Sequence, residues 1–243
     1  MRGTSAAVAL LLLLAATGCN RAPSSSSAPV ASGFGVAIVD LSGEKQTASA
    51  GATLDQPVVA QVNDAQGTGV TGALVQFSAP DGVRFDPPSG LTGSDGQFST
   101  TVRLGGASGG YSLVATTQDK AGKPIQVTFA EIALDYQQTL GQVLNERYCS
   151  RCHNSDSTAE RVSNHDNLSV APHSFSDGAT LNQVSRANLV AIITHGGAAL
   201  SKSPEMPPYS PTLSASDIEA LTAYIRAIAD PPYRPQGVFN ANP

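Results

Sequence analysis

The sequence predicts a multidomain fold in which an all-β sandwich over about residues 34–133 is followed by an all-α domain over about residues 134–231. Three observations lead to this fold class. Short alternating or β-branched runs, separated by Asp-Gly and Gly-Gly turns, recur at close spacing up to Ile132. After Ala133 the apolar residues change to helical spacing. The 243 residues are enough to bury two modest cores.

The first eighteen residues, "MRGTSAAVALLLLLAATG", have the layout of a signal peptide. Arg2 supplies a positive start, an apolar run follows from Ala6 to Ala16, and small residues lead up to Gly18. The apolar run is shorter than a membrane span requires. We therefore expect residues 1–18 to direct export and then to be removed. An ordinary signal peptide with a chance cysteine after it is the simpler alternative.

The stretch "AATGC" places Cys19 directly after two small residues. It resembles the lipobox of bacterial lipoproteins, with Ala16 at the position where Leu is commonest. The resemblance implies that Cys19 receives a diacylglycerol and becomes the acylated first residue of the mature protein. Multiple acyl chains anchor a protein stably in a membrane. Because Asn20 is not the Asp of the inner-membrane retention signal, we expect a lipoprotein outside the cytoplasm, at the outer membrane and periplasm or at the cell surface.

Two segments lie outside the predicted domains. Residues 19–33 include "NRAPSSSSAPVASG", whose Ser, Pro and Ala content carries too little apolar surface to fold. We interpret them as a tether between lipid and first domain. Residues 232–243 form a C-terminal tail.

The charge pattern excludes one class of partner. Charged residues make up 14% of the chain, the formal net charge is −5, and no run of Lys or Arg occurs. Nucleic-acid binding usually requires clustered basic residues, so no nucleic-acid partner is expected.

Residues 34–133 contain about seven strand-like runs, which favours an antiparallel β-sandwich. The stretches "VNDAQGTGVTGALVQFSAP", "SGLTGSDGQFSTTVRLGGASGGYSLVAT" and "AGKPIQVTF" carry a resemblance to bacterial Ig-like domains of the invasin and intimin type. Such modules mostly act as stiff spacers. The resemblance implies a stalk that lifts the next domain away from the membrane.

Two helices are expected first in the second domain. Residues 136–148 place four apolar side chains on one face, which we expect to be buried: Tyr136, Leu140, Val143 and Leu144. The stretch "SRANLVAIITHGG" predicts a helix with Ser185 as its N-cap and two glycines at its end. Leu189, Ile192 and Ile193 are expected to face inward.

A third helix is predicted in "SASDIEALTAYIRAIADPP". Ser216 and Glu219 have the spacing of a capping box, and Pro231 is expected to stop the helix. Ile218, Leu221, Ile225 and Ile228 form its apolar stripe.

The motif "CSRCH" places Cys149, Cys152 and His153 at the end of the first of these helices. A structural zinc site needs four ligands, and the mature chain has no second cysteine pair. A thioredoxin-like pair would follow a strand, and a disulfide here would close a very small loop and leave His153 unexplained. The remaining interpretation is covalent haem attachment, in which both thiols add to vinyl groups and the imidazole reaches the iron.

Met206 supports this interpretation. It is the only methionine after Met1, it stands 53 positions after His153, and prolines lie close on both sides of it. A lone methionine often fills a gap in a core, but a Pro-flanked loop is poorly placed for helical packing. Ligation of iron by His and Met is the arrangement found in cytochromes c and raises the potential.

Together these stretches resemble a class I c-type cytochrome domain over about residues 134–231. The resemblance is carried by the helix before "YCSRCH", the helix before "HGG", the "MPPY" loop and the "LSASDIEALTAYIRAIA" helix. It implies one covalently attached haem c, with thioethers from Cys149 and Cys152, His153 as proximal ligand of the iron and Met206 as distal ligand. It also implies that the first and last helices cross. The residues expected at that crossing or in the haem pocket are Leu140, Leu221, Tyr224 and Ile225.

The segment from Asn154 to Ser185 is longer and more polar than the resemblance predicts, and it is interpreted as an enlarged loop over one haem edge. It contains His165 and His173. The remaining histidine, His195, is the first residue of "HGG" and stands at the end of the second predicted helix. Each of the three is expected to be a solvated surface histidine. Any of them is a replacement ligand if Met206 does not bind the iron.

A six-coordinate haem has no open position, so the chain is expected to transfer electrons between extracytoplasmic redox proteins rather than to act as an enzyme by itself. It could still be the electron-transfer subunit of an oxidoreductase. Two alternatives stay open. One is a haem enzyme or a gas or redox sensor with a releasable distal ligand, and the other is an adhesion module that carries a redox domain.

Overall fold

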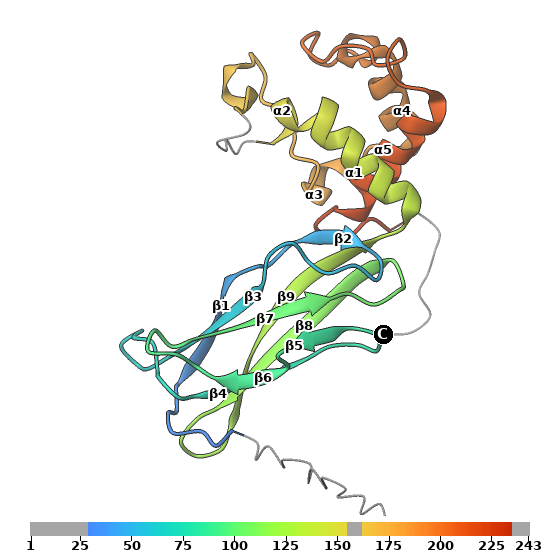
Figure 1. The fold of residues 1–243 in the computed structure, drawn as a ribbon. Coiled ribbons are helices and arrows are strands. Elements are labelled where there is room, and N and C mark those ends of the chain that lie inside the picture. The colour runs from blue at the N-terminus through green and yellow to red at the C-terminus, as the bar shows by residue number, and fades with distance from the viewer. Residues whose placement is uncertain (1–28, 155–161, 235–243) are drawn as a thin grey trace, which may run out of the picture.

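The computed structural model describes residues 29–154 and 162–234, and in them a β-sandwich is followed by a helical region (Figure 1). The predicted fold class, an all-β Ig-like sandwich followed by an all-α cytochrome c domain, is confirmed. The predicted signal peptide, Cys19 and most of the tether lie outside the described residues, as does the end of the C-terminal tail.

The sandwich is built from two sheets. The first has the strand order β1-β3-β7-β5 and the second the order β2-β9-β8-β4-β6. The strands are β1 (Ala37–Ser42), β2 (Thr47–Ser49), β3 (Val58–Asn63), β4 (Leu74–Ser78), β5 (Arg84–Asp86), β6 (Ser89–Leu91), β7 (Gln97–Arg103), β8 (Gly109–Gln118) and β9 (Pro124–Leu134).

The longest ladder joins β8 and β9, which pair antiparallel from Gly109 opposite Ala133 to Gln118 opposite Pro124. All other pairs are antiparallel as predicted, except that β2 pairs with β9 in parallel. β2 continues from β1 after the chain has crossed to the second sheet. This crossing puts Thr47–Ser49 beside the last residues of β9, where the sandwich ends.

Alternation along the strands supplies the core of the sandwich. On β3 the side chains of Val58, Ala60 and Val62 are fully buried while their neighbours are only partly covered. Phe129 on β9 is also fully buried and contacts Phe77, with ring centroids 6.1 Å apart. The inward residues of the two sheets therefore make one apolar layer.

Glu131 breaks this apolar pattern. It lies on the inward face of β9 between Phe129 and Ala133, and it is 1% exposed. One carboxylate oxygen accepts a hydrogen bond from the backbone N–H of Gln46 at 2.7 Å. The other oxygen is buried without a partner among the described residues. Burial, together with the nearby charge of Glu44, raises the pKa of Glu131 to about 7, although the Gln46 hydrogen bond opposes the shift.

Among the described residues, the helical region has three helices of ten or more residues, which match the predictions, and four short ones that were not predicted. The α-helices are α1 (Tyr136–Tyr148), α2 (Ser150–His153), α3 (Gly178–Leu181), α4 (Arg186–His195) and α5 (Ala215–Ala227), and the 3-10 helices are η1 (His165–Asn167) and η2 (Gly197–Leu200). None of the helices in the described part of the chain has the length and apolar character needed to cross a bilayer.

The buried face of α1 differs from the predicted one. Tyr136 is 88% exposed, Val143 is 55% exposed and Leu140 is 36% exposed, so these three side chains face solvent. The buried residue is Gly141, where a Cβ atom would lie only 2.1 Å from the carbonyl oxygen of Ala220 on α5. The backbones of the two helices touch at this glycine. Leu144, the fourth predicted residue, is partly buried and packs against the cluster that contains Leu221 and Ile225 of α5.

The other helices confirm most of the predicted ends. Ser185 caps α4 by accepting a hydrogen bond from the Asn188 N–H, and Gly196 ends α4 with a positive φ of 82°. The predicted capping box of α5 is wrong by two residues. Ser214 is the N-cap and Asp217 completes the box.

The rest of α5 follows the prediction. Ile218, Leu221 and Ile225 are buried, Ile228 is the half-buried C-cap, and the helix ends at Ala227, before Pro231. Tyr224 is also buried and packs against Gly141. Of the four residues expected at the crossing or in the haem pocket, Tyr224 lies at the crossing, Leu221 and Ile225 are buried in the core of the helical region, and Leu140 is exposed.

A very short connection joins the two domains. β9 ends at Leu134 and α1 begins at Tyr136, so Asp135 is both the connecting residue and the N-cap of α1. Gln142 on α1 donates a hydrogen bond to the Thr47 hydroxyl at 3.0 Å, and the hydroxyls of Ser49 and Thr139 are 3.1 Å apart. β2 thus carries polar contacts to α1 on the side of the sandwich that faces the helices (Figure 1).

Candidate functional site

Cys149, Cys152 and His153 are positioned by one tight helical turn. Cys149 is the C-cap of α1 and also the N-cap of α2. Its carbonyl oxygen accepts hydrogen bonds from the N–H groups of Cys152 and His153, each at 3.0 Å. The Ser150 hydroxyl ties this turn back to α1 through the Glu146 carbonyl. The two thiols and the imidazole are therefore presented together at the end of the crossing helix.

His153 is held in one orientation by two contacts. Its Nδ1 lies 2.8 Å from the carbonyl oxygen of His173, and its ring stacks on Phe175 with centroids 4.3 Å apart. Because a carbonyl only accepts, Nδ1 carries the proton and Nε2 keeps its lone pair. Burial lowers the pKa of His153 and so favours the neutral ring. The imidazole is arranged as an oriented ligand.

Met206 lies in the loop between η2 and α5. The Met206 carbonyl accepts a hydrogen bond from the Gly197 N–H at 3.0 Å. A Cβ atom at Gly196 would lie 2.8 Å from the same carbonyl, so the loop packs directly on the backbone at the end of α4. The two glycines of "HGG" therefore end the helix and also make room for the methionine loop.

Tyr209 connects this loop to the turn that carries the cysteines. Its hydroxyl donates to the Tyr148 carbonyl at 2.8 Å, next to Cys149. Burial raises the pKa of Tyr209 to about 12, so the hydroxyl stays protonated and can donate at any physiological pH. The methionine loop is anchored on α1 as well as on α4.

The four predicted site residues, Cys149, Cys152, His153 and Met206, all line one cavity of about 300 Å³. The rest of its wall is largely apolar and includes Leu168, Val170, Leu181, Leu189, Ile193 and Ile225. The structure therefore brings the predicted residues together, although they come from parts of the sequence more than 50 positions apart.

Cys149 is placed poorly for thiolate chemistry. Burial, with a smaller effect of Cys152, raises the pKa of Cys149 to about 12. A nucleophilic or metal-binding cysteine works as the thiolate, which requires a lowered pKa. No disulfide joins Cys149 and Cys152, and burial favours the neutral S–H form of Cys149.

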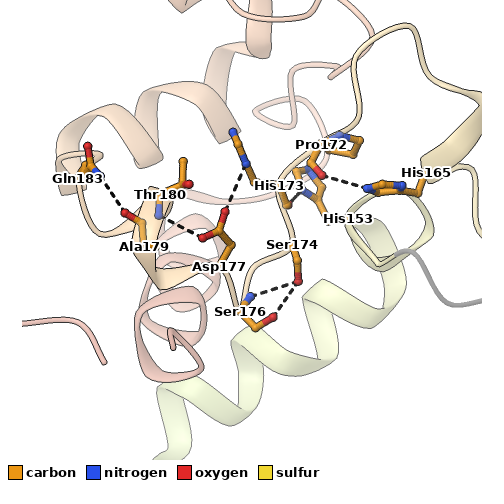
Figure 2. A network of polar contacts seen from close by, with 10 residues as sticks. All are labelled: His153, His165, Pro172, His173, Ser174, Ser176, Asp177, Ala179, Thr180 and Gln183. Carbon is orange, nitrogen blue, oxygen red and sulfur yellow. Dashed lines mark hydrogen bonds and ion pairs between the residues drawn. The ribbon is translucent and has the colours of Figure 1, made fainter. Parts of the chain in front are cut away.

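The three other histidines differ in exposure. His195 is exposed at the end of α4, as predicted. His173 is also largely exposed, with Nδ1 3.5 Å from an Asp177 oxygen. His165 is more buried than predicted, with a side chain 21% exposed, because its ring nitrogens contact Asp166 at 2.9 Å and the Pro172 carbonyl at 3.2 Å. Figure 2 shows the His165–Pro172 and His173–Asp177 contacts, which lie near His153.

The segment after Asn154 contributes more to the site than its polar sequence indicated. Leu168, Val170, the His173 carbonyl and Phe175 all reach the cavity or His153. One sequence signal could have found Phe175, because it is the only Phe, Tyr or Trp between Tyr148 and Tyr209. No sequence pattern indicates that the His173 carbonyl would bond the His153 ring, because any residue supplies a backbone carbonyl.

The sandwich, the crossing helices and this cavity define a two-domain protein whose C-terminal domain is of the cytochrome c type. Two family models match the chain. Residues 38–130 match the bacterial Ig-like domain (group 1), and residues 137–225 match the family described as cytochrome C oxidase, cbb3-type, subunit III. The cytochrome c-type domain implies haem c and haem-based electron transfer.

Solved structures similar to this chain include pieces of intimin and invasin. The D00-D0 domain of intimin is 18% identical and covers 42% of this chain and 48% of its own, with a TM-score of 0.33. The D0-D1 domain of intimin is 18% identical and covers 44% and 50%, with a TM-score of 0.33. Invasin, described as a bacterial integrin-binding protein, is 18% identical and covers 40% and 18%, with a TM-score of 0.28.

This chain therefore spans about half the length of the intimin structures that it matches. Scores of this size carry no argument about function. A comparison with curated proteins found no match.

Proposed function

We propose that the protein is a lipid-anchored monohaem c-type cytochrome that transfers electrons between extracytoplasmic redox proteins, with the Ig-like domain as a spacer. The observation that carries this proposal is the meeting of Cys149, Cys152, His153 and Met206 on one apolar cavity. Two thiols, an imidazole and a thioether in such a cavity are the donor set that haem c requires.

The residues fit this cofactor chemically. The thiols of Cys149 and Cys152 would hold the haem by adding across its two vinyl groups, and burial keeps the Cys149 thiol in its protonated form. His153 offers Nε2 because Nδ1 is engaged by the His173 carbonyl. Met206, which lines the same cavity, would hold the iron through its sulfur. When bound, the haem iron supplies one-electron transfer by cycling between its ferrous and ferric states.

In this function the polypeptide would position His153 and Met206 and exclude water from the cavity. Phe175 and the His173 carbonyl fix the imidazole plane, while Tyr209 and Gly197 fix the loop of Met206. The apolar wall lowers the local dielectric, and with Met/His ligation this favours a raised potential.

The length of β9 and its direct connection to the helices support a spacer role for the Ig-like domain. β9 is eleven residues long, which is roughly 36 Å at about 3.3 Å per residue. It passes into α1 through Asp135 alone. The proposed lipid on Cys19 and the address outside the cytoplasm rest on the sequence pattern of residues 1–33.

The first test is the state of the cofactor in the purified full-length protein. We expect haem to remain with the polypeptide in denaturing electrophoresis, and the reduced absorbance spectrum to be unchanged by carbon monoxide because both axial positions are filled. The variant with Cys149→Ser and Cys152→Ser should lose the covalent haem. Release of haem from the unsubstituted protein would refute covalent attachment, and ready binding of carbon monoxide would favour a sensor or enzyme.

Replacement of the proposed distal ligand is the second test. Met206→Ala should open the iron to carbon monoxide and lower the reduction potential, because the thioether favours ferrous iron. Absorbance spectra and redox titration measure both effects. His195→Ala is the matched control, since this exposed histidine should leave the spectrum unchanged. An unaltered spectrum in Met206→Ala would show that another group binds the iron.

A further inference from the structure

Residues 169–175 contact His153 at one end and the residue before Met206 at the other, so this segment lies between the two proposed iron ligands. Ser169 lies at one end of it and Phe175 at the other, and its residues form one wall of the cavity. At the Phe175 end, the ring and the His173 carbonyl hold His153. At the Ser169 end, the segment contacts Glu205, the residue before Met206. We call residues 169–175 the strap.

Glu205 makes several hydrogen bonds to the strap and to its own loop. One of its carboxylate oxygens accepts from the Ser169 N–H at 3.0 Å and from the Ser169 hydroxyl at 2.5 Å. The Ser203 hydroxyl also lies 3.3 Å from this oxygen. The Ser203 hydroxyl in turn accepts from the Glu205 N–H at 3.2 Å. Hydrogen bonds to a carboxylate are stronger than those between neutral groups, so the two bonds from Ser169 hold Glu205 firmly.

Glu205 is adjacent to Met206, so its contacts with the strap also restrict the position of Met206. The other anchors of the methionine loop, Gly197 and Tyr209, attach it to the ends of α4 and α1. Glu205 attaches it to the strap, on the side where the wall of the cavity is a loop and has no helix. Only one peptide unit separates the Glu205 Cα from the Met206 Cα, so movement of one displaces the other.

We propose that Glu205 is a positioning residue whose contacts with Ser169 clasp the methionine loop to the strap and so restrict the release of Met206 from the haem iron. The inference rests on the proposed function, because it takes Met206 as the distal ligand. The strap then links the two axial ligands through the protein, with His153 at one end and Met206 at the other. Loss of the clasp frees the loop at its least supported side.

The experiment compares full-length holoproteins that carry Glu205→Ala, Glu205→Gln or Asp166→Ala. Added imidazole competes with Met206 for ferric iron, and loss of the methionine-to-iron charge-transfer band reports the exchange. Glu205→Ala should raise the apparent affinity for imidazole about tenfold, which corresponds to about 1.4 kcal/mol. Glu205→Gln keeps an acceptor oxygen and should restore most of the difference. Asp166→Ala is the control, because this nearby carboxylate contacts the His165 ring and, among the described residues, bonds neither Ser169 nor the methionine loop.

A second measurement separates the clasp from a general loss of stability. Hydrogen exchange of the Ser169 amide, followed by NMR, should accelerate in Glu205→Ala and stay unchanged in Asp166→Ala. The clasp is refuted if Glu205→Ala leaves the imidazole affinity within about twofold of the unsubstituted protein, or if Asp166→Ala raises it equally. Absence of the charge-transfer band in the unsubstituted protein is a different result, since it refutes Met206 as ligand and the proposed function with it.

Discussion

Replacing Gly141 with alanine should destabilise the helical domain by about 2 kcal/mol or more, although alanine is the better helix former by about 1 kcal/mol. The added Cβ would lie 2.1 Å from the Ala220 carbonyl oxygen and 2.7 Å from the Tyr224 Cβ. Backbone and Cβ atoms cannot move aside as the end of a flexible side chain can, so α1 and α5 must separate. Chemical denaturation followed by far-UV circular dichroism measures the effect.

The test is whether Gly141→Ala lowers or raises the free energy of unfolding. Close packing of the helices predicts a decrease, whereas the helix propensity of alanine predicts an increase. Gly106→Ala is a suitable control, since no atom lies within 4 Å of the position its Cβ would take. Its effect should stay within about 0.5 kcal/mol. A Gly141→Ala protein that is more stable than the unsubstituted one would show that the two helices do not meet at this residue.

The stability of the Ig-like domain should fall as the pH rises, because of Glu131. The pKa of Glu131 is about 7 in the folded protein against a usual value of 4.5. Between these two values the folded state keeps a proton that the unfolded state has lost, so stability is greatest below pH 4.5 and decreases up to about pH 7. From pH 5 to pH 8 the loss should be about 2–3 kcal/mol, at about 1.36 kcal/mol per pKa unit.

Urea unfolding followed through the NMR signals of β8 and β9 at several pH values measures this loss. Glu131→Gln cannot ionise and should flatten the dependence, whereas Asp81→Asn, at an exposed position of the same domain, should leave it in place. A pH dependence that survives Glu131→Gln would assign the effect to other groups. The junction should respond as well, because the Gln46 N–H that bonds Glu131 lies directly before Thr47, which contacts α1.

The sequence was sufficient for the fold class because the two domains bury their apolar residues at different periods. Alternation marks β3, and Ser185 with the following apolar residues marks α4. The buried face of α1 could not be predicted from the sequence. The two helix backbones meet at Gly141, and a glycine carries no hydrophobic signal. Tyr136 and Val143 matched the helical period and still face solvent.

The error at the start of α5 has an identifiable cause. Both Ser214 with Asp217 and Ser216 with Glu219 have the spacing of a capping box. With Ser214 as N-cap, Leu213 and Ile218 occupy the two positions of a hydrophobic staple, and both are buried in the same cluster. The other pair would place alanines there. Packing of the flanking residues therefore chose between two caps that are locally equivalent.

The candidate site was predictable in its chemistry but only partly in its supports. Side-chain types and spacing indicated Cys149, Cys152, His153 and Met206, which share one cavity in the structure. The groups that orient them include a backbone carbonyl and a carboxylate that acts 36 positions away from its partner. Backbone contacts between distant loops depend on tertiary structure and leave no pattern in a single sequence.

Asp135 restricts how the helical domain can move relative to the sandwich. Since this one residue is both the whole connection between β9 and α1 and the cap of α1, the helical domain has no hinge of its own at this point. Hydrogen bonds from β2 to α1 hold it further. A turn of the helical domain against the sandwich would therefore have to change the backbone at Asp135 and break these two hydrogen bonds.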